Sequence, residues 1–304
     1  MNSESHFPAI SPSMARERFL IQDESWEDRF RPDFNQFIIA PLEYARPVIK
    51  LPLPPGRTNN HVLFLVTKGQ LEMTVGYTNY ILSANELVVI PASQIFSLST
   101  IGEDTTGFMC FFSNELYLSA IGEKELDFMK LTGNSLVSLT DTQTGHMTAV
   151  CARLTAEYTE NGATQTDLIR PYLLALLTEI NRAYIGSTSS KVDAGDRLVQ
   201  QFMDLVAKHV RQQRFVTDYA SQLNVTPNYL NKVIKARTGK SPSIWIDERI
   251  VLEAKVLLFQ STLTVAQISA ELGFDDQSNF GKVFRRYARV SPIAFRRQCA
   301  GAND

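Results

Sequence analysis

The chain has 304 residues, of which 44% are hydrophobic and 20% are charged, a balance typical of a soluble globular protein large enough for two domains. No apolar run approaches the ~18 residues of a membrane span, and the N-terminus lacks a basic segment followed by an apolar core. We therefore expect a cytoplasmic protein with no secretion signal and no membrane partner. The cysteines are odd in number and widely spaced, which predicts reduced thiols instead of a disulfide frame or a zinc site: Cys110, Cys151 and Cys299.

The formal net charge of −2 conceals two parts of opposite sign. Residues 197–304 contain 16 Lys and Arg against 9 Asp and Glu, a formal charge of +7. Residues 1–196 contain 14 basic against 23 acidic side chains, a formal charge of −9. A basic C-terminal domain favours a polyanionic partner, and the acidic remainder should lie away from that partner.

The chain begins with a polar segment, residues 1–36, which predicts an N-terminal arm with a helical turn near 13–19 or a disordered terminus. From Phe37 onward the segments are short, rich in β-branched and aromatic residues, and separated by turn residues, which predicts strands. The expected strands lie at residues 37–41, 45–51, 61–69, 70–83, 85–92 and 105–112. Six strands in about 80 residues predict a small jelly-roll barrel.

The interior of such a barrel is a candidate small-molecule site. Its expected lining is apolar with two tyrosine hydroxyls, a composition typical of ligand pockets. The candidate effector-pocket residues are Phe64, Val66, Met73, Tyr77, Tyr80, Phe96 and Phe108. The same side chains would equally fill a closed core, so both interpretations stay open.

Two helices are predicted after the strands, at residues 145–161 and 166–185. In the second helix, apolar residues alternate by four and three, which is the spacing of a coiled-coil seam. These residues are Ile169, Leu173, Leu176 and Ile180. The seam would pair two subunits into a homodimer, or it would cover the barrel of its own chain. Residues 186–196 are small and polar and predict an interdomain linker.

Catalytic chemistry finds little support in the sequence. A transition-metal site of imidazoles and carboxylates needs clustered histidines. Only His61 lies among the predicted strands, no histidine stands two residues from it, and it is expected at the surface or at a strand edge. The chain contains neither a Gly-x-Ser-x-Gly elbow nor a Walker-type phosphate loop. We therefore expect no metal, no cofactor and no enzymatic activity.

The C-terminal part contains an internal duplication. Residues 230–242 recur at 280–292, so that Leu230 corresponds to Phe280 and the Ser-Pro pair at 241–242 recurs at 291–292. In the second copy the apolar residues follow the i, i+3, i+4, i+7 spacing of one helix face. These residues are Phe280, Val283, Phe284 and Tyr287.

Each copy is predicted to be the second helix of a helix-turn-helix, preceded by a short helix at 215–223 or 265–274. Thr226 before Pro227 is a strong helix start, and Asp275 is expected to cap the second copy. A helix at 242–260, about 28 Å long, would join the two units. One turn of B-DNA measures about 34 Å, so two such units fit successive major grooves.

Residues 219–258 and 265–296 resemble the AraC/XylS family of bacterial transcription regulators, whose DNA-binding domain consists of two helix-turn-helix units joined by a long helix. The family usually has Gly where this chain has Arg289, at a helix C-terminus that favours a left-handed residue, so arginine there costs about 1 kcal/mol. The strands that precede this region resemble the cupin-like sensor domain common in these regulators.

The resemblance implies an α+β protein of two domains, with a cupin-like jelly-roll barrel and two helices before an all-α double helix-turn-helix. The expected parts are the arm (1–36), the sensor domain with its helices (37–185), the linker (186–196) and the DNA-binding domain (197–304).

The resemblance also implies which side chains meet double-stranded DNA, because the family contacts base edges from the exposed face of each second helix. By position, the base-reading residues are Asn228, Asn231, Lys232, Gln277, Ser278 and Lys282. Basic residues nearby are expected to hold phosphates: Lys235, Arg237, Lys240, Arg285 and Arg286. Gly281 faces the groove and permits close approach.

The function implied is a sequence-specific transcription regulator, controlled by a small-molecule effector and contacting RNA polymerase if it is an activator. Two alternatives stay open. One is a metal-independent cupin enzyme fused to a DNA-targeting domain, and the other is a ligand-free regulator controlled by protein contact.

Overall fold

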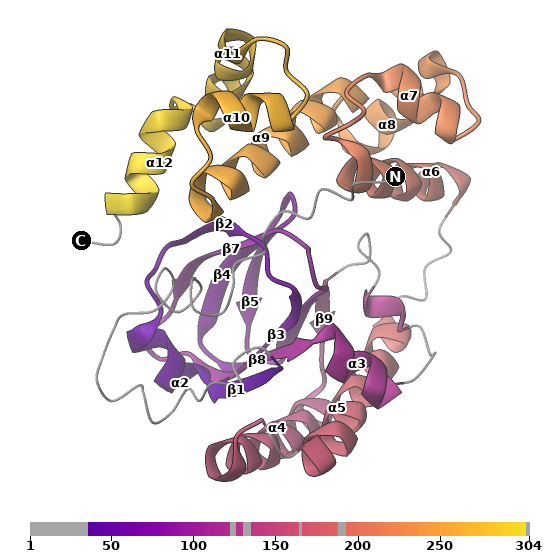
Figure 1. Ribbon diagram of the computed structural model, residues 1–304. Coiled ribbons are helices and arrows are strands. Elements are labelled where there is room, and N and C mark those ends of the chain that lie inside the picture. Colours follow the sequence, from indigo (N-terminus) through magenta and orange to yellow (C-terminus); the bar gives the residue numbers. More distant parts are fainter. Residues whose placement is uncertain (1–35, 122–125, 130–134, 164–165, 188–192, 302–304) are drawn as a thin grey trace. The chain divides into compact units, whose positions relative to one another are not determined.

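The computed structural model describes residues 36–121, 126–129, 135–163, 166–187 and 193–301 (Figure 1). The chain forms two compact units that divide near residue 190. We call them unit 1, which combines strands and helices, and unit 2, which is helical in the residues described. The predicted arm at 1–36, except Gln36, and the middle of the predicted linker lie outside the described residues.

Unit 1 contains two antiparallel sheets. Strand order is β1-β8-β3-β6-β9 in the five-stranded sheet and β2-β7-β4-β5 in the four-stranded sheet. The strands are β1 (Phe37–Pro41), β2 (Leu53–Gly56), β3 (Asn60–Lys68), β4 (Gln70–Val75), β5 (Thr78–Ser83), β6 (Glu86–Ile90), β7 (Phe96–Ile101), β8 (Thr106–Ser113) and β9 (Leu136–Ser138).

The five-stranded sheet is covered on both faces, because successive side chains of a strand point to opposite sides. In β3, Val62, Phe64 and Val66 belong to the apolar core shared with the four-stranded sheet. Leu63 and Leu65 belong to a second core, which lies against the helices. The alternation of two apolar faces in this segment therefore reflects burial on both sides, as its sequence predicts.

Helices α4 (Asp141–Asn161) and α5 (Thr166–Ser187) lie next to one another along the five-stranded sheet (Figure 1). Helix α4 begins four residues earlier than predicted because Thr140 forms a capping box with Gln143. The backbone N–H of Gln143 donates to the Thr140 hydroxyl, and the Gln143 side-chain oxygen accepts from the Thr140 N–H at 2.8 Å. A shorter helix, α3 (Asn114–Ile121), follows β8 directly.

The prediction that the α5 stripe pairs two subunits is contradicted. Its four members are between 0% and 1% exposed within a single chain: Ile169, Leu173, Leu176 and Ile180. They pack into the core formed with α3, α4 and the five-stranded sheet. A seam of alternating apolar residues looks the same in sequence whether the helix meets another chain or its own sheet, and here it meets its own sheet.

Two other expectations for unit 1 differ from the structure. Residues 45–51 were expected to form a strand, yet α2 (Leu42–Ala45) leads into the 3-10 turn η2 (Arg46–Val48), because Pro47 has the fixed φ of a helical turn. The predicted closed cupin-like barrel is not confirmed. Within the described residues, no strand of one sheet pairs with a strand of the other, so the arrangement is a two-sheet structure.

Unit 2 begins with α6 (Ala194–His209) and contains two short helix pairs. They are α7 (Val216–Gln222) with α8 (Pro227–Thr238), and α10 (Val265–Glu271) with α11 (Gln277–Ala288). Helix α9 (Pro242–Gln260) runs between the two pairs, and α12 (Pro292–Gly301) follows the second pair (Figure 1). The predicted duplication and the predicted connecting helix are both confirmed by these elements.

The two turns differ in length by one residue. Asn224 and Gly273 have positive φ angles at equivalent turn positions 49 residues apart, whereas α8 and α11 are offset by 50. The extra residue shifts the helix cap. Asp276 accepts from the Ser278 N–H at 3.0 Å, so the expected cap at Asp275 is wrong by one position. The hydrogen bond from Ser278 also lowers the pKa of Asp276.

We predict that Leu173→Ala lowers the free energy of unfolding of unit 1 by about 2–5 kcal/mol, because it leaves a cavity in a fully buried position. Leu174→Ala is the matched control, since Leu174 is 38% exposed and should change stability by less than about 1 kcal/mol. Calorimetric unfolding of the full chain compares the two variants. Similar losses for both would contradict the burial described for α5.

We predict that Arg289→Gly raises the free energy of unfolding of unit 2 by about 1 kcal/mol, because Arg289 adopts a left-handed backbone that disfavours a Cβ. Its φ is 64°, and the equivalent C-cap, Gly239, has a φ of 75°. Gly239→Ala should lower the free energy of unfolding by a similar amount. Backbone strain alone sets this loss, because no atom lies within 4 Å of a Cβ placed there and no clash is added. Urea unfolding followed by Trp245 fluorescence, with Trp26 replaced by Phe, measures both changes.

Candidate nucleic-acid interface

We call α8 and α11 the reader helices, since each is the second helix of its helix-turn-helix. Their inward faces are built from buried residues four positions apart, Leu230 and Ile234 in α8 and Phe280 and Phe284 in α11. Phe280 meets Phe274 edge-on at 5.4 Å, and Phe284 meets the ring of Phe295 in α12 at 5.9 Å. Burial of this face turns the opposite face of each helix to solvent.

The exposed faces of the two reader helices match one another. Lys232 in α8 corresponds to Lys282 in α11, and Lys235 corresponds to Arg285. One turn earlier, Asn228 corresponds to Ser278. All six side chains are exposed, and their i, i+4, i+7 spacing places each set on one helix face. We call these two sets the reader faces.

The remaining predicted base-reading residues lie at the edges of the reader faces. Gln277 is the first residue of α11 and is exposed. Asn231 is half-buried, and its Nδ2 donates to the carbonyl of Pro227 at 3.0 Å. That bond turns the Asn231 amide back onto its own helix and leaves its Oδ1 and one N–H for another partner.

The second reader face borders a basic hollow with a volume of about 550 Å³. It is lined by residues of α11 and the start of α12: Ser278, Gly281, Lys282, Arg285, Arg286 and Pro292. A Cβ placed on Gly281 would have no atom of the chain within 4 Å. Packing within the chain therefore does not require glycine here, although glycine in a helix interior costs about 0.5–1 kcal/mol relative to alanine.

Two of the five predicted phosphate ligands are engaged elsewhere. Arg237 forms ion pairs with Asp193 and Asp196. Lys240 bonds both carboxylate oxygens of Glu248, at 2.7 and 2.9 Å. Both cations are thus paired with acids of the same chain, which the sequence could not reveal because the acids come from other elements.

The other three predicted phosphate ligands are Lys235, Arg285 and Arg286. They are exposed and make no ion pair among the described residues. They therefore stay as the candidate phosphate contacts.

The candidate effector-pocket residues of unit 1 separate into two groups. Four of them lie together in the core between the sheets: Phe64, Val66, Met73 and Phe96. Tyr80 packs against this core, and Tyr77 is half-buried in the turn between β4 and β5. Phe108 packs against the other core, because its neighbour Met109 points between the sheets. Because successive side chains of β8 point to opposite faces, Phe108 does not face the core between the sheets, and the prediction for it is wrong.

His61 is 5% exposed, so the expected surface or strand-edge position is wrong. Its Nδ1 accepts from the Ala92 N–H at 3.0 Å, and its Nε2 lies 3.2 Å from the Asn114 Oδ1. The ring stacks on Phe112 at 5.1 Å. Burial lowers the pKa of His61 to about 4, so both ring nitrogens serve the fold in the neutral form.

No group of three or more His, Cys, Asp or Glu side chains in the described part of the chain is arranged to hold a metal ion. No helix in the same part is long and apolar enough to cross a membrane.

The helix-turn-helix region of unit 2 is similar to known proteins. A family model for a helix-turn-helix domain matches residues 219–298. The regulatory protein PocR of Salmonella typhimurium is 30% identical over 103 residues, 34% of this chain and 34% of that protein. The arabinose operon regulatory protein of Escherichia coli is 27% identical over 105 residues, 34% of this chain and 36% of that protein. The aligned region thus spans about a third of each of these relatives.

Among solved structures, ToxT from Vibrio cholerae O395 aligns with 88% of this chain and 98% of its own, at 13% identity and a TM-score of 0.44.

Two helix-turn-helix pairs joined by one long helix, with matched basic faces, define unit 2 as a double helix-turn-helix domain. Residues 219–298 are similar to the helix-turn-helix domain of the AraC/XylS family of transcription regulators.

We predict that Gly281→Ala stabilises unit 2 by about 0.5–1 kcal/mol, because α11 gains a better helix former where space is open. The same change should weaken binding to DNA, since the added methyl group fills the approach to the hollow. Urea unfolding and fluorescence anisotropy on a labelled duplex measure the two effects. Gly145→Ala is the control, because Gly145 is an equally unobstructed helical glycine in α4. Unchanged DNA affinity for Gly281→Ala would show that this face does not approach DNA.

Proposed function

We propose that the protein is a sequence-specific DNA-binding regulator of transcription, acting by binding and without catalysis. The observation that carries the proposal is the repeat of one reader face on two helices, each with two basic side chains in the same positions. Exposure to solvent alone does not require the same charges to recur at an offset of 50 residues. Binding to two successive major grooves of B-DNA, about 34 Å apart, does require two similar basic faces.

Successive turns of each reader helix would contact different parts of the DNA. Lys232 and Lys282 stand one turn into their helices, where side chains reach base edges, and lysine pairs with guanine there. Asn228 and Ser278 precede them and offer further polar groups to the bases. Lys235, Arg285 and Arg286 stand a further turn on, where the helix leaves the groove and meets phosphates. The hollow beside Gly281 would admit the sugar-phosphate backbone.

Unit 1 is proposed to be a cupin-like sensor that controls unit 2. Its support is a core between two sheets in which Phe64, Met73 and Phe96 meet, with the Tyr80 ring at the margin. A small apolar molecule bound among them would be the effector. Homodimerisation and contact with RNA polymerase belong to the same proposal. A dimer would need a surface other than the α5 stripe, which is buried.

We predict that two exposed lysines of α8 act differently on DNA. Lys232→Ala should cost about 1–3 kcal/mol on a duplex selected by the wild-type chain and much less on random DNA, because a base contact is lost. Lys235→Ala should weaken both alike and reduce the slope of log K against log salt by about one, because a phosphate contact is lost.

The measurement is a salt titration of the full chain and each variant on both duplexes. Each lysine serves as the matched control for the other, since both are exposed and both variants remove one charge. Equal losses on the two duplexes for Lys232→Ala would contradict its role as a base reader. A salt slope unchanged by Lys235→Ala would contradict its phosphate contact.

A further inference from the structure

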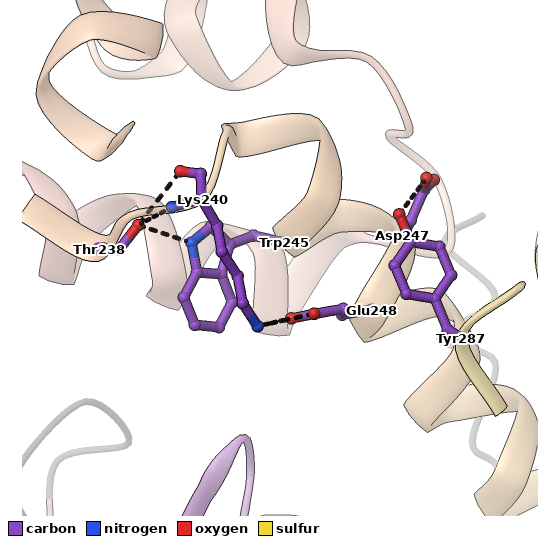
Figure 2. Close-up of polar contacts among 6 residues, drawn as sticks. All are labelled: Thr238, Lys240, Trp245, Asp247, Glu248 and Tyr287. Carbon is purple, nitrogen blue, oxygen red and sulfur yellow. Dashed lines mark hydrogen bonds and ion pairs between the residues drawn. The ribbon is translucent and has the colours of Figure 1, made fainter. Parts of the chain in front are cut away.

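The two reader helices are tied at the same position to other helices of unit 2. Tyr287 is the penultimate residue of α11, and its hydroxyl donates to the Asp247 Oδ2 of α9 at 3.0 Å (Figure 2). Fifty residues earlier, Arg237 is the penultimate residue of α8 and pairs with Asp193, the N-cap of α6, and with Asp196 of α6. Helix α6 precedes the first helix-turn-helix as α9 precedes the second. Each reader helix therefore ends on an acid from the helix before its own unit.

The two ties differ in chemistry. The Arg237 ion pair joins side chains that are 45% and 49% exposed, so water and salt screen it and it contributes little. The Tyr287 tie is a hydrogen bond between half-buried groups. Burial, followed by the charge of Asp247, raises the pKa of Tyr287 to about 12, so the phenol keeps its proton and remains a donor. Salt should therefore loosen the first tie far more than the second.

Helix α9 also holds the end of the first reader helix. The Trp245 Nε1 donates to the Thr238 hydroxyl at 3.0 Å, and Lys240 lies 4.7 Å from the centre of the Trp245 ring while bonding Glu248 (Figure 2). The residues 50 positions later are Ala288, Val290, Phe295 and Gln298, which lack this set of polar groups. One turn of α9 thus contacts the ends of both readers, with Trp245 bonding Thr238 of α8, Glu248 bonding Lys240 just after α8, and Asp247 bonding Tyr287 of α11.

Apolar packing alone leaves the angle of α11 incompletely defined. Phe280 and Phe284 anchor its first and middle turns, but apolar contact is non-directional. The tie at Tyr287 acts on the last turn, which carries Arg285 and Arg286, and the Arg286 guanidinium lies 5.5 Å from the Tyr287 ring. A hydrogen bond has a preferred direction and length, so it restrains rotation of that turn about the aromatic anchor.

We propose that the Tyr287–Asp247 hydrogen bond is a positioning contact that sets the angle between the two reader helices and thereby the half-site spacing that the protein accepts. The inference rests on the proposed DNA-binding function. Tyr287 and Asp247 act through the reader helix and touch no base. Loss of the bond leaves each reader able to bind its own half-site but lets the second reader tolerate a shifted one.

The experiment uses the full chain and a duplex that the wild type selects from a random pool. Affinity is measured on that duplex, on the same duplex with one base pair inserted between the half-sites, and on a duplex with the second half-site scrambled. The quantity of interest is the ratio of the first affinity to the second. We expect Tyr287→Phe to reduce this ratio about 5-fold, in line with the loss of one directional hydrogen bond. Affinity for the single half-site should stay within about 2-fold.

Three variants test the pair itself. Asp247→Asn keeps an acceptor oxygen and should keep the spacing ratio. Asp247→Ala should match Tyr287→Phe, and the double variant should lose no more than either single variant, because the two residues share one interaction. Tyr44→Phe is the matched control, since it removes a hydroxyl from an exposed tyrosine of unit 1.

The outcomes separate the inference from the proposed function. Equal weakening of all three duplexes by Tyr287→Phe would reduce the contact to a structural role and overturn the inference. An unchanged ratio, or a selected sequence with a single half-site, would overturn it as well. If the wild type selects no sequence at all, the proposed function itself fails.

Discussion

The burial of two apolar side chains four residues apart on each reader helix is the constraint on which unit 2 depends. Because an α-helix returns to the same face after about one turn, burying Phe280 and Phe284 presents Lys282 and Arg285 to solvent. The same geometry in α8 presents Lys232 and Lys235. The place of the candidate interface on each helix is therefore a consequence of the core behind it, and both copies share it.

Unit 1 is organised by a different constraint, the covering of one sheet on both faces. The five-stranded sheet needs a partner on each side, and it finds the second sheet on one side and α4 and α5 on the other. This demand accounts for the stripe of α5, for the buried thiols of Cys110 and Cys151, and for the position of His61. Residues that resemble an interface, a reactive group or a ligand in sequence are here parts of a closed core.

The duplication explains both the likeness and the asymmetry of the two reader units. The apolar positions and the exposed cations recur at an offset of 50, because packing and charge each depend on residue type at one helix face. The polar contacts that hold the helix ends recur in position but not in kind. Arg237 and Tyr287 occupy equivalent positions and bind acids, but one tie is an exposed ion pair and the other a half-buried hydrogen bond. The end of α11 is therefore held more firmly by its bond to an acid than the end of α8 is.

The sequence by itself determined the two helix-turn-helix pairs of unit 2, their order, the connecting helix and the exposed residues of the reader faces, because helical periodicity and caps such as Thr226 are local. It did not predict α6 or α12. It also determined most strands of unit 1, though β2, β7 and β9 were missed, since they are short or follow turn-rich segments.

Only the tertiary structure decided what depends on distant partners. It assigned the α5 stripe to the sheet of its own chain and engaged Arg237 and Lys240 with acids from other helices. It also joined Tyr287 to Asp247, 40 residues apart in sequence. Periodicity shows which way a side chain points along its own helix, but what it meets there depends on how separate elements pack.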